Sequence, residues 1–162
     1  MVTPVAASGT RLSALWARLA PLPGGKRLFS WLLGWMVPYT GTIRPRVVEL
    51  RPGYAKITMR DRRGVRNHLR SVHAIALANL AEVTSGLAVT TGLPPTARGI
   101  PTALSITFLK KARGALTAEA RCRLPDASPD GNYDFESVIS DASGQVVARA
   151  TVRWHIGPVP AR

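Results

Sequence analysis

A long apolar stretch lies at the centre of the chain, between Ser71 and Ser85. Its hydrophobic residues recur at helical spacing, and no proline or glycine interrupts them before Gly86 to Gly92, where the pattern stops. The stretch therefore predicts one well-buried α-helix of about four to five turns. Four polar side chains in or just before it are not needed by such a helix: Asn67, His73, Asn79 and Glu82. Charged groups are rarely buried unless they are paired or functional, so Glu82 is the residue to explain.

The N-terminal part of the chain has two further helical patterns. The first begins near Thr10 and stops at Pro21, and the second runs from about Lys26 to Met36. The second is apolar nearly all round, so another surface must cover it. It is too short to span a bilayer, which takes about 20 residues. We expect it to pack on the domain; the alternatives are contact with a membrane surface through residues 26–36, or a lid over an acyl pocket.

From about Thr42 the hydrophobic period changes to two, which is typical of β-strands. Two short runs flank a Pro52-Gly53 turn and predict a hairpin. Four strand-like runs follow the central helix and are expected to form a meander: residues 103–111, 116–124, 133–139 and 146–156. This order predicts an α+β fold in which a strongly curved antiparallel sheet wraps one long helix. We expect residues 1–41 to form a helical extension and residues 42–162 to form the main domain.

Composition narrows the possible partners. The formal charge is +13, from 22 Lys and Arg against 9 Asp and Glu, which favours a polyanionic small molecule, a nucleic acid or an anionic membrane. The basic residues are dispersed and no nucleic-acid motif is present, so we expect no nucleic-acid partner. A single cysteine and three histidines give no metal-ligand spacing, and no metal is expected. With no signal-peptide pattern at the N-terminus, these features predict a cytoplasmic protein.

The polar residues of the central helix form a recognisable motif. Asn67, His73 and Glu82 occur in the pattern N-x5-H-A-I-x4-L-A-E. This pattern resembles the signature of hotdog-fold acyl-CoA thioesterases, and most closely that of the small bacterial thioesterases associated with phenylacetate degradation. Segments 106–114 and 133–157 resemble later motifs of the same family. The resemblance covers about residues 43–157 and implies a hotdog fold.

The resemblance also implies roles for individual residues. Glu82 matches the general base or nucleophile, and Asn67 matches the residue that positions the thioester or the lytic water. The resemblance also places His73 among the catalytic residues. It precedes the helix N-terminus, where the backbone N–H groups of Ala74 and Ile75 would polarise the thioester carbonyl. A helix N-terminus offers unpaired donors and partial positive charge, which suit an oxyanion. A carboxylate in an apolar helix should have a raised pKa and be a better base near neutral pH.

Further contacts follow from position. Asn79 and Ser85 lie three residues before and after Glu82, on the same helix face, and could orient a water. Lys110 and Lys111 end a predicted strand and could contact coenzyme A phosphates. The implied substrate is an acyl-CoA or an acyl-carrier-protein thioester. Coenzyme A is thus part of the substrate, and no cofactor is expected.

The helix geometry suggests an oligomer. His73 and Glu82 are nine residues apart, which places them about 180° apart around a helix and about 13 Å along it. One helix therefore cannot easily aim both at one bond, whereas a second helix from a partner subunit can. The resemblance implies the same arrangement, with active sites shared across a side-by-side interface. We expect a homodimer or a dimer of dimers.

Several alternatives remain open. The Gly-Gly that usually follows the histidine is Ala74-Ile75 here, and Ile75 could block close approach of a substrate to the backbone. This departure favours a non-catalytic acyl-CoA or lipid-binding protein. His68, fourteen residues before Glu82, matches the spacing of hotdog dehydratases but lacks their intervening Pro and Gly residues. In the simplest case, Glu82 pairs with an arginine, while Asn67 and His73 only organise a turn and a helix cap.

Overall fold

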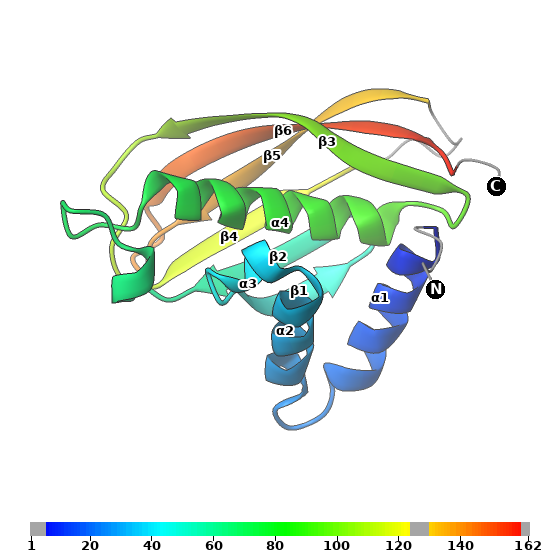
Figure 1. The fold of residues 1–162 in the computed structure, drawn as a ribbon, viewed down its shortest axis with the longest axis horizontal. Helices are drawn as coiled ribbons and strands as arrows, with labels where there is room; N and C mark the ends of the chain where they lie inside the picture. The colour runs from blue at the N-terminus through cyan, green and yellow to red at the C-terminus, as the bar shows by residue number, and fades with distance from the viewer. Residues whose placement is uncertain (1–5, 124–129, 160–162) are drawn as a thin grey trace.

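The computed structural model describes residues 6–123 and 130–159. Its centre is a six-stranded antiparallel sheet with the strand order β1-β2-β4-β5-β6-β3. Figure 1 shows the long helix α4 lying across one face of this curved sheet. The strands are β1 (Arg46–Arg51), β2 (Tyr54–Met59), β3 (Ala97–Phe108), β4 (Leu116–Arg121), β5 (Gly131–Ser140) and β6 (Val146–Pro158). The predicted α+β hotdog architecture is therefore confirmed.

Helix α4 (Ala74–Gly92) forms the core with the concave face of the sheet. It begins after Ser71 because His73 caps it, and it continues through Gly86 to Gly92, where the sequence pattern suggested a gradual end. By length and composition α4 could cross a membrane, but 61% of its apolar window is buried inside the protein, as expected of a core helix. The wrapped sheet, and not a bilayer, covers its apolar surface.

The predicted period of two is observed in β4 and in most of β6, but not in β3, which is exposed on both faces along most of its length. In β4 every second residue is buried (Leu116, Ala118 and Ala120), and the buried Cys122 beyond the strand continues this face. Leu124, the end of the predicted run, lies outside the described residues. Gly53 has φ of 73°, which is the left-handed conformation that the predicted hairpin turn requires. In β6 the same period holds for Ala148, Ala150, Val152, Trp154 and Ile156, but Val147, which the alternation places on the outward face, is also buried, and Val146 is only partly buried.

The expected four-strand meander is wrong in one respect. Strands β4, β5 and β6 are consecutive neighbours, but β3 pairs with β6 at the edge of the sheet, and the chain then crosses to place β4 beside β2. Strand β3 also begins earlier than predicted, at Ala97, because its first residues pair with the end of β6. The sequence pattern did not predict this part of the strand, because Pro101 interrupts it and proline is unusual within strands. This proline is tolerated because it lies on an edge strand, beside a register shift between Pro101 and Ala103.

The N-terminal extension packs closely on the rest of the protein. It contains α1 (Ala6–Leu19), α2 (Gly25–Met36) and the short α3 (Pro38–Gly41), which lie together on one side of α4 in Figure 1. The Ser30 hydroxyl of α2 accepts a hydrogen bond from the backbone N–H of Val47 at 2.9 Å. The ammonium of Lys26 donates to the carbonyl of Val48 at 2.8 Å. The predicted packing of α2 on the domain is therefore confirmed for its Phe29 and Leu33 face.

Candidate active site

Glu82 lies on the one face of α4 that the sheet does not cover. Ile75 and Glu82 are seven residues apart, so they point in nearly the same direction, about 20° apart around the helix. Ile75 is 55% exposed and Glu82 is half-buried. In Figure 1 this part of the molecule has β3 on one side of α4 and the N-terminal helices on the other. The carboxylate therefore lies on an open strip of an otherwise buried helix.

The surroundings of Glu82 are apolar. A Cβ atom placed on Gly86 would lie 3.9 Å from Oε1 of Glu82 and 3.2 Å from the ring of Trp154, so the carboxylate lies close to this part of the core. Within residues 6–123 and 130–159, no ion pair includes Glu82. Burial raises the pKa of its carboxyl group above the ordinary value for glutamate. The expectation of a raised pKa is met, and the simple pairing of Glu82 with an arginine is not observed.

The N-terminus of α4 is capped by His73. The Nδ1 atom of this imidazole accepts a hydrogen bond from the backbone N–H of Ile75 at 3.1 Å. Ala74 is the first residue of the helix, so its N–H also points out of the helix end. The backbone N–H groups of Ala74 and Ile75 thus both lie in the first turn of α4, and that of Ile75 already has a partner on its own chain.

Asn67 organises the loop before the helix. Its Oδ1 atom accepts hydrogen bonds from the N–H of Leu69 at 3.0 Å, and from the N–H and the hydroxyl of Ser71 at 3.2 and 3.1 Å. These bonds leave only the side-chain amide nitrogen free to face a substrate. Arg70 in this loop has φ of 54°, which is in the left-handed region. The turn-forming role of Asn67 is therefore observed directly.

The two supporting residues proposed from spacing have structural partners. The Nδ2 atom of Asn79 donates to the carbonyl of Tyr39 at 3.1 Å and so attaches α3 to α4. The hydroxyl of Ser85 donates to the carbonyl of Glu82 and accepts from the indole N–H of Trp154 at 3.3 Å. Neither bond involves the Glu82 carboxylate. The structure does not bring these two side chains together around a water beside it.

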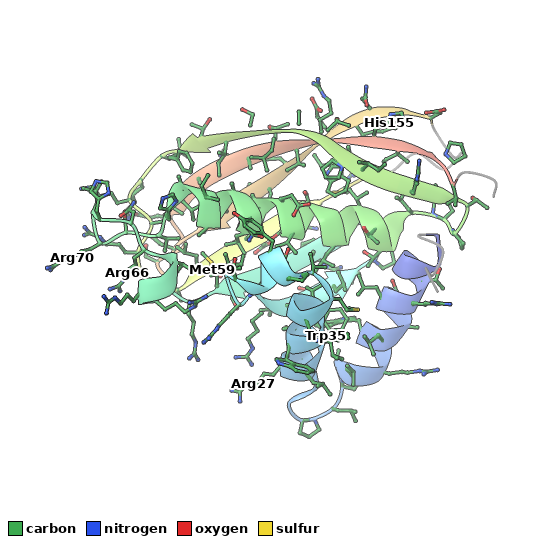
Figure 2. The ribbon with its side chains drawn as sticks, viewed as in Figure 1. Arg27, Trp35, Met59, Arg66, Arg70 and His155 are labelled. Atoms are coloured by element: carbon green, nitrogen blue, oxygen red, sulfur yellow. The ribbon has the colours of Figure 1, made fainter. Side chains whose placement is uncertain are left out.

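Basic residues gather at the N-terminal end of α4. The loop before α4 and the connection after β3 meet there, because the N–H of Val72 bonds to the carbonyl of Ala112 at 2.8 Å. Figure 2 shows Arg66 and Arg70 projecting at this end of the molecule. Asp61 is the one acidic residue in these two segments. Its carboxylate accepts a hydrogen bond from Arg66, and this bond lowers the pKa of Asp61. We call the following set the basic cluster: Arg62, Arg63, Arg66, Arg70, Lys111 and Arg113.

Lys110 and Lys111 differ in their contacts. The ammonium of Lys110 lies 2.9 Å from Asp141 and also donates to the side chain of Gln145. Lys111 is exposed, and no hydrogen bond or ion pair of its side chain is found within the described part of the chain. Lys111 is therefore available to a phosphate, whereas Lys110 already holds the turn between β5 and β6.

A small groove of about 190 Å³ lies beside the N-terminus of α4. Its walls include His73, Ile75 and Asn79 from this part of the chain, and Tyr39 and Ile43 from the N-terminal region. The contribution of Tyr39 was not predicted from the sequence, because the distance along the chain gives no sign that α3 returns to α4. The N-terminal extension thus forms part of the wall of the candidate site.

The edge strand β3 extends the apolar surface beyond α4. Leu104 and Phe108 pair directly with Val152 and Ala148, so they share the face of the sheet that carries the helix. Yet Leu104 is 39% exposed, and Phe108 is exposed as well, because α4 does not reach over this edge. An edge strand with exposed apolar side chains is a surface on which another chain can pack.

Other reactive groups are less suitable. Burial raises the pKa of the Cys122 thiol to about 12, so it is not a nucleophile near neutral pH. His68 is exposed in the loop after Asn67 and has no recorded hydrogen-bond partner within the described segments. Across residues 6–123 and 130–159, no three His, Cys, Asp or Glu side chains are grouped as metal ligands would be. Glu82 is the one half-buried carboxylate on the open face of α4.

The fold and this arrangement together define a hotdog-fold, thioesterase-like protein. A family model for a domain of unknown function, DUF4442, matches residues 25–156. The chain belongs to this family, whose matched region begins at α2 and so includes part of the N-terminal extension. No curated protein matches the chain.

Solved structures support the fold assignment. The chain is 33% identical to the structural-genomics protein APC5556, with a TM-score of 0.81, and the match covers 91% of this chain and 99% of the other. It is 25% identical to PA5026 from Pseudomonas aeruginosa, described as a probable thioesterase, with a TM-score of 0.69 and coverage of 85% and 97%. A hypothetical thioesterase from Streptococcus pneumoniae, solved with coenzyme A, is 20% identical, with a TM-score of 0.61 and coverage of 72% and 91%.

Proposed function

We propose that this protein hydrolyses the thioester of an acyl-CoA, with Glu82 as general base or nucleophile. The observation that carries the proposal is the state of Glu82. It is half-buried on the open face of an apolar helix, it has no ion-pair partner within the described residues, and burial raises its pKa. A desolvated carboxylate without a structural partner is costly to fold, so it is expected to have a catalytic use.

The N-terminus of α4 would hold the thioester carbonyl. The N–H groups of Ala74 and Ile75 point out of the helix end, where the positive end of the helix dipole stabilises a developing oxyanion. The adjacent groove, lined by Ile75 and Tyr39, would receive part of the acyl group. Asn67 would act mainly as a positioning residue, because its Oδ1 atom holds the loop that precedes the helix.

The basic cluster would bind the phosphates of coenzyme A. It lies at the same end of α4 as the proposed oxyanion site, and Asp61 is the one acid in its two segments. Lys111 is a better candidate than Lys110, which is paired with Asp141. The hypothetical thioesterase of Streptococcus pneumoniae binds coenzyme A, which supports a substrate of the same class here.

The site is proposed to be completed by a second copy of the chain. Glu82 and the N-terminus of α4 lie on one helix but far apart along it, and the apolar side chains of Leu104 and Phe108 on the edge strand are exposed. A second copy docked at β3 would cover this surface and bring its own helix N-terminus toward Glu82. The proposed assembly is therefore a side-by-side homodimer, which could pair again into a dimer of dimers.

A second candidate function is acyl-CoA binding without turnover. The hydrogen bond from the N–H of Ile75 to His73 occupies one of the two proposed oxyanion donors. The Ile75 side chain also stands, 55% exposed, where the related thioesterases have glycine. Both features would weaken stabilisation of an oxyanion while leaving a groove for the acyl group.

Thiol release from short, medium, long and aromatic acyl-CoAs tests the proposal, with Glu82→Gln as the paired variant. Loss of a general acid or base typically costs about 10²- to 10⁴-fold in rate, so release should fall by at least about 100-fold in the variant. Glu136→Gln is a matched control, because Glu136 is exposed and paired with Arg149. Tight acyl-CoA binding by both wild type and Glu82→Gln, with no release by either, would instead establish the binding function.

A further inference from the structure

A second apolar surface lies on the N-terminal helices, away from the candidate site. Several exposed residues of α2 and of the turn before it are large and hydrophobic, among them Trp31 at 63% and Trp35 at 71%. Figure 2 shows Trp35 and Arg27 on α2, away from α4 and the sheet. Helices α1 and α2 form a helical hairpin, and we call the following set of its residues the hairpin face: Leu22, Leu28, Trp31 and Trp35.

Helix α2 separates a packed face from this open one. Phe29 and Leu33 are buried against the domain. Leu28, Trp31 and Trp35 fall within about 60° of one another on the opposite side of the helix. A surface helix of a soluble domain normally has polar residues at such positions. The exposed indoles therefore indicate a surface that is covered when the protein functions.

The N-terminal segment that carries the hairpin face has charges of a single sign. Residues 1–48 contain six basic residues, Arg11, Arg18, Lys26, Arg27, Arg44 and Arg46, and no Asp or Glu. All six are exposed. The first acidic residue of the chain is Glu49. An apolar face rich in Trp and Leu, on a segment whose charged residues are all basic, is complementary to a lipid surface that carries anionic headgroups.

The dimensions fit an interfacial position. Helix α2 has 12 residues and is about 18 Å long, which is too short to cross a bilayer. Trp side chains are favoured at the level of the headgroups, because the ring is apolar and its N–H is polar. The hydrogen bonds from Val47 N–H to Ser30 and from Lys26 to the carbonyl of Val48 hold α2 on the domain. The hairpin face is therefore presented by a fixed element.

We propose that the hairpin face docks the protein reversibly on membranes that contain anionic phospholipids. Trp31, Trp35 and Leu28 would enter the headgroup region, and Arg27 would contact lipid phosphates. The inference is independent of the chemistry at Glu82, since none of these residues lines the groove at α4. Tyr39, which does line that groove, follows α2 directly, so docking would bring the groove near the membrane surface.

Vesicle flotation tests this inference. The full chain should float with vesicles made of equal parts phosphatidylglycerol and phosphatidylcholine, and not with phosphatidylcholine alone. Because screening lengths fall to a few ångströms, salt at about 0.5 M should weaken the binding. Binding should also shift tryptophan emission to shorter wavelength. Trp31 and Trp35 are the source expected for this shift, since Trp154 is buried and Trp16 packs against Phe29.

Two variants and one control distinguish the possible outcomes. Trp31→Ser combined with Trp35→Ser should lower affinity for the mixed vesicles by at least about tenfold while leaving the circular dichroism spectrum unchanged, because both side chains are mostly exposed. Arg27→Gln should bind about fivefold more weakly, and Arg149→Gln, on β6, should bind like wild type. Flotation of the double Trp variant at wild-type level would overturn the proposal. So would absence of wild-type binding, or a change of oligomeric state in the double Trp variant, which would show that a second copy covers this face.

Discussion

The imidazole Nδ1 of His73 accepts a hydrogen bond from the backbone N–H of Ile75, at 3.1 Å, across the first turn of α4. The bond makes His73 the N-cap of the core helix. It also means that the capping side chain and any substrate oxyanion compete for the same donor.

Loss of this cap should destabilise the protein with little effect on chemistry. His73→Ala is expected to lower the free energy of unfolding by about 1 kcal/mol, the usual value of an N-cap. This corresponds to a fall in Tm of about 2–4 °C for a chain of this size. His73→Asn should retain wild-type Tm, because asparagine is also a good cap. If His73→Ala abolished thiol release while Tm was unchanged, His73 would be a catalytic residue and not a cap.

Replacement of Ile75 by glycine should open the end of the helix. Ile75→Gly removes a side chain that stands over the proposed oxyanion donors, so thiol release should rise by at least about tenfold; one such donor is worth about 10²–10³ in kcat. Stability should fall by up to about 1 kcal/mol, the cost of glycine in a helix. Ile75→Ala retains a Cβ atom and should give a smaller rise. Equal or slower release by both variants would show that Ile75 does not obstruct the site.

Ionisation of Glu82 should make stability depend on pH. Its pKa in the folded protein is raised, so the folded state holds its proton at pH values where the unfolded chain has lost it. The free energy of unfolding therefore falls as pH rises from the ordinary glutamate pKa, about 4.3, through the raised value. Glu82→Gln should have a higher Tm than wild type at about pH 8, and the difference should vanish near pH 3.5.

The same titration should appear in catalysis. With Glu82 acting as a base, the acid limb of kcat/KM should have an apparent pKa above the ordinary value of about 4.3. Glu136→Gln should leave the pH profile of kcat/KM unchanged, because Glu136 lies on β5, paired with Arg149, and is not part of the proposed site. An acid limb at or below the ordinary value would argue against Glu82 as the base.

Two exposed residues on opposite faces of β3 can test which face forms the proposed dimer interface. Leu104 faces the helix side of the edge strand, whereas Ile100 pairs with His155 on the opposite side, and the two are 39% and 46% exposed. Leu104→Lys would bury a charge at the interface and should weaken dimerisation by about 3 kcal/mol, roughly a hundredfold in Kd. Ile100→Lys should stay dimeric in light scattering. Monomeric wild-type protein at micromolar concentration would refute the shared site.

The neighbouring lysines Lys110 and Lys111 should differ in their effect on coenzyme A binding. Lys111→Ala removes an unpaired cation of the basic cluster and should raise KM for acyl-CoA about fivefold, from about 1 kcal/mol of lost attraction. KM for an acyl-N-acetylcysteamine thioester, which lacks the nucleotide, should not change. Lys110→Ala should have little effect on either KM, because Lys110 is paired with Asp141. Equal effects on both thioesters would exclude a phosphate contact for Lys111.

Most elements of the fold follow from the sequence, because local periodicity decides them. The alternation of β4 and β6, the turn at Gly53 and the two helices before Pro38 all depend on residues close to one another in the chain. The carboxylate in the apolar helix can likewise be predicted from the sequence, since Glu82 lies in a hydrophobic stretch that no proline or glycine interrupts. The motif around it predicts the hotdog fold correctly.

Only the tertiary structure decided the contacts between distant segments. Strand β3 pairs with β6 instead of following a meander, because the end of α4 returns the chain to that edge of the sheet. Asn79 holds Tyr39, and Lys110 holds Asp141, although each pair is separated by more than thirty residues. These contacts give Asn79 and Lys110 structural partners. Among the described residues, the carboxylate of Glu82 has no ion-pair partner. The sequence states which groups are present, and the long-range packing decides which of them stay free to act.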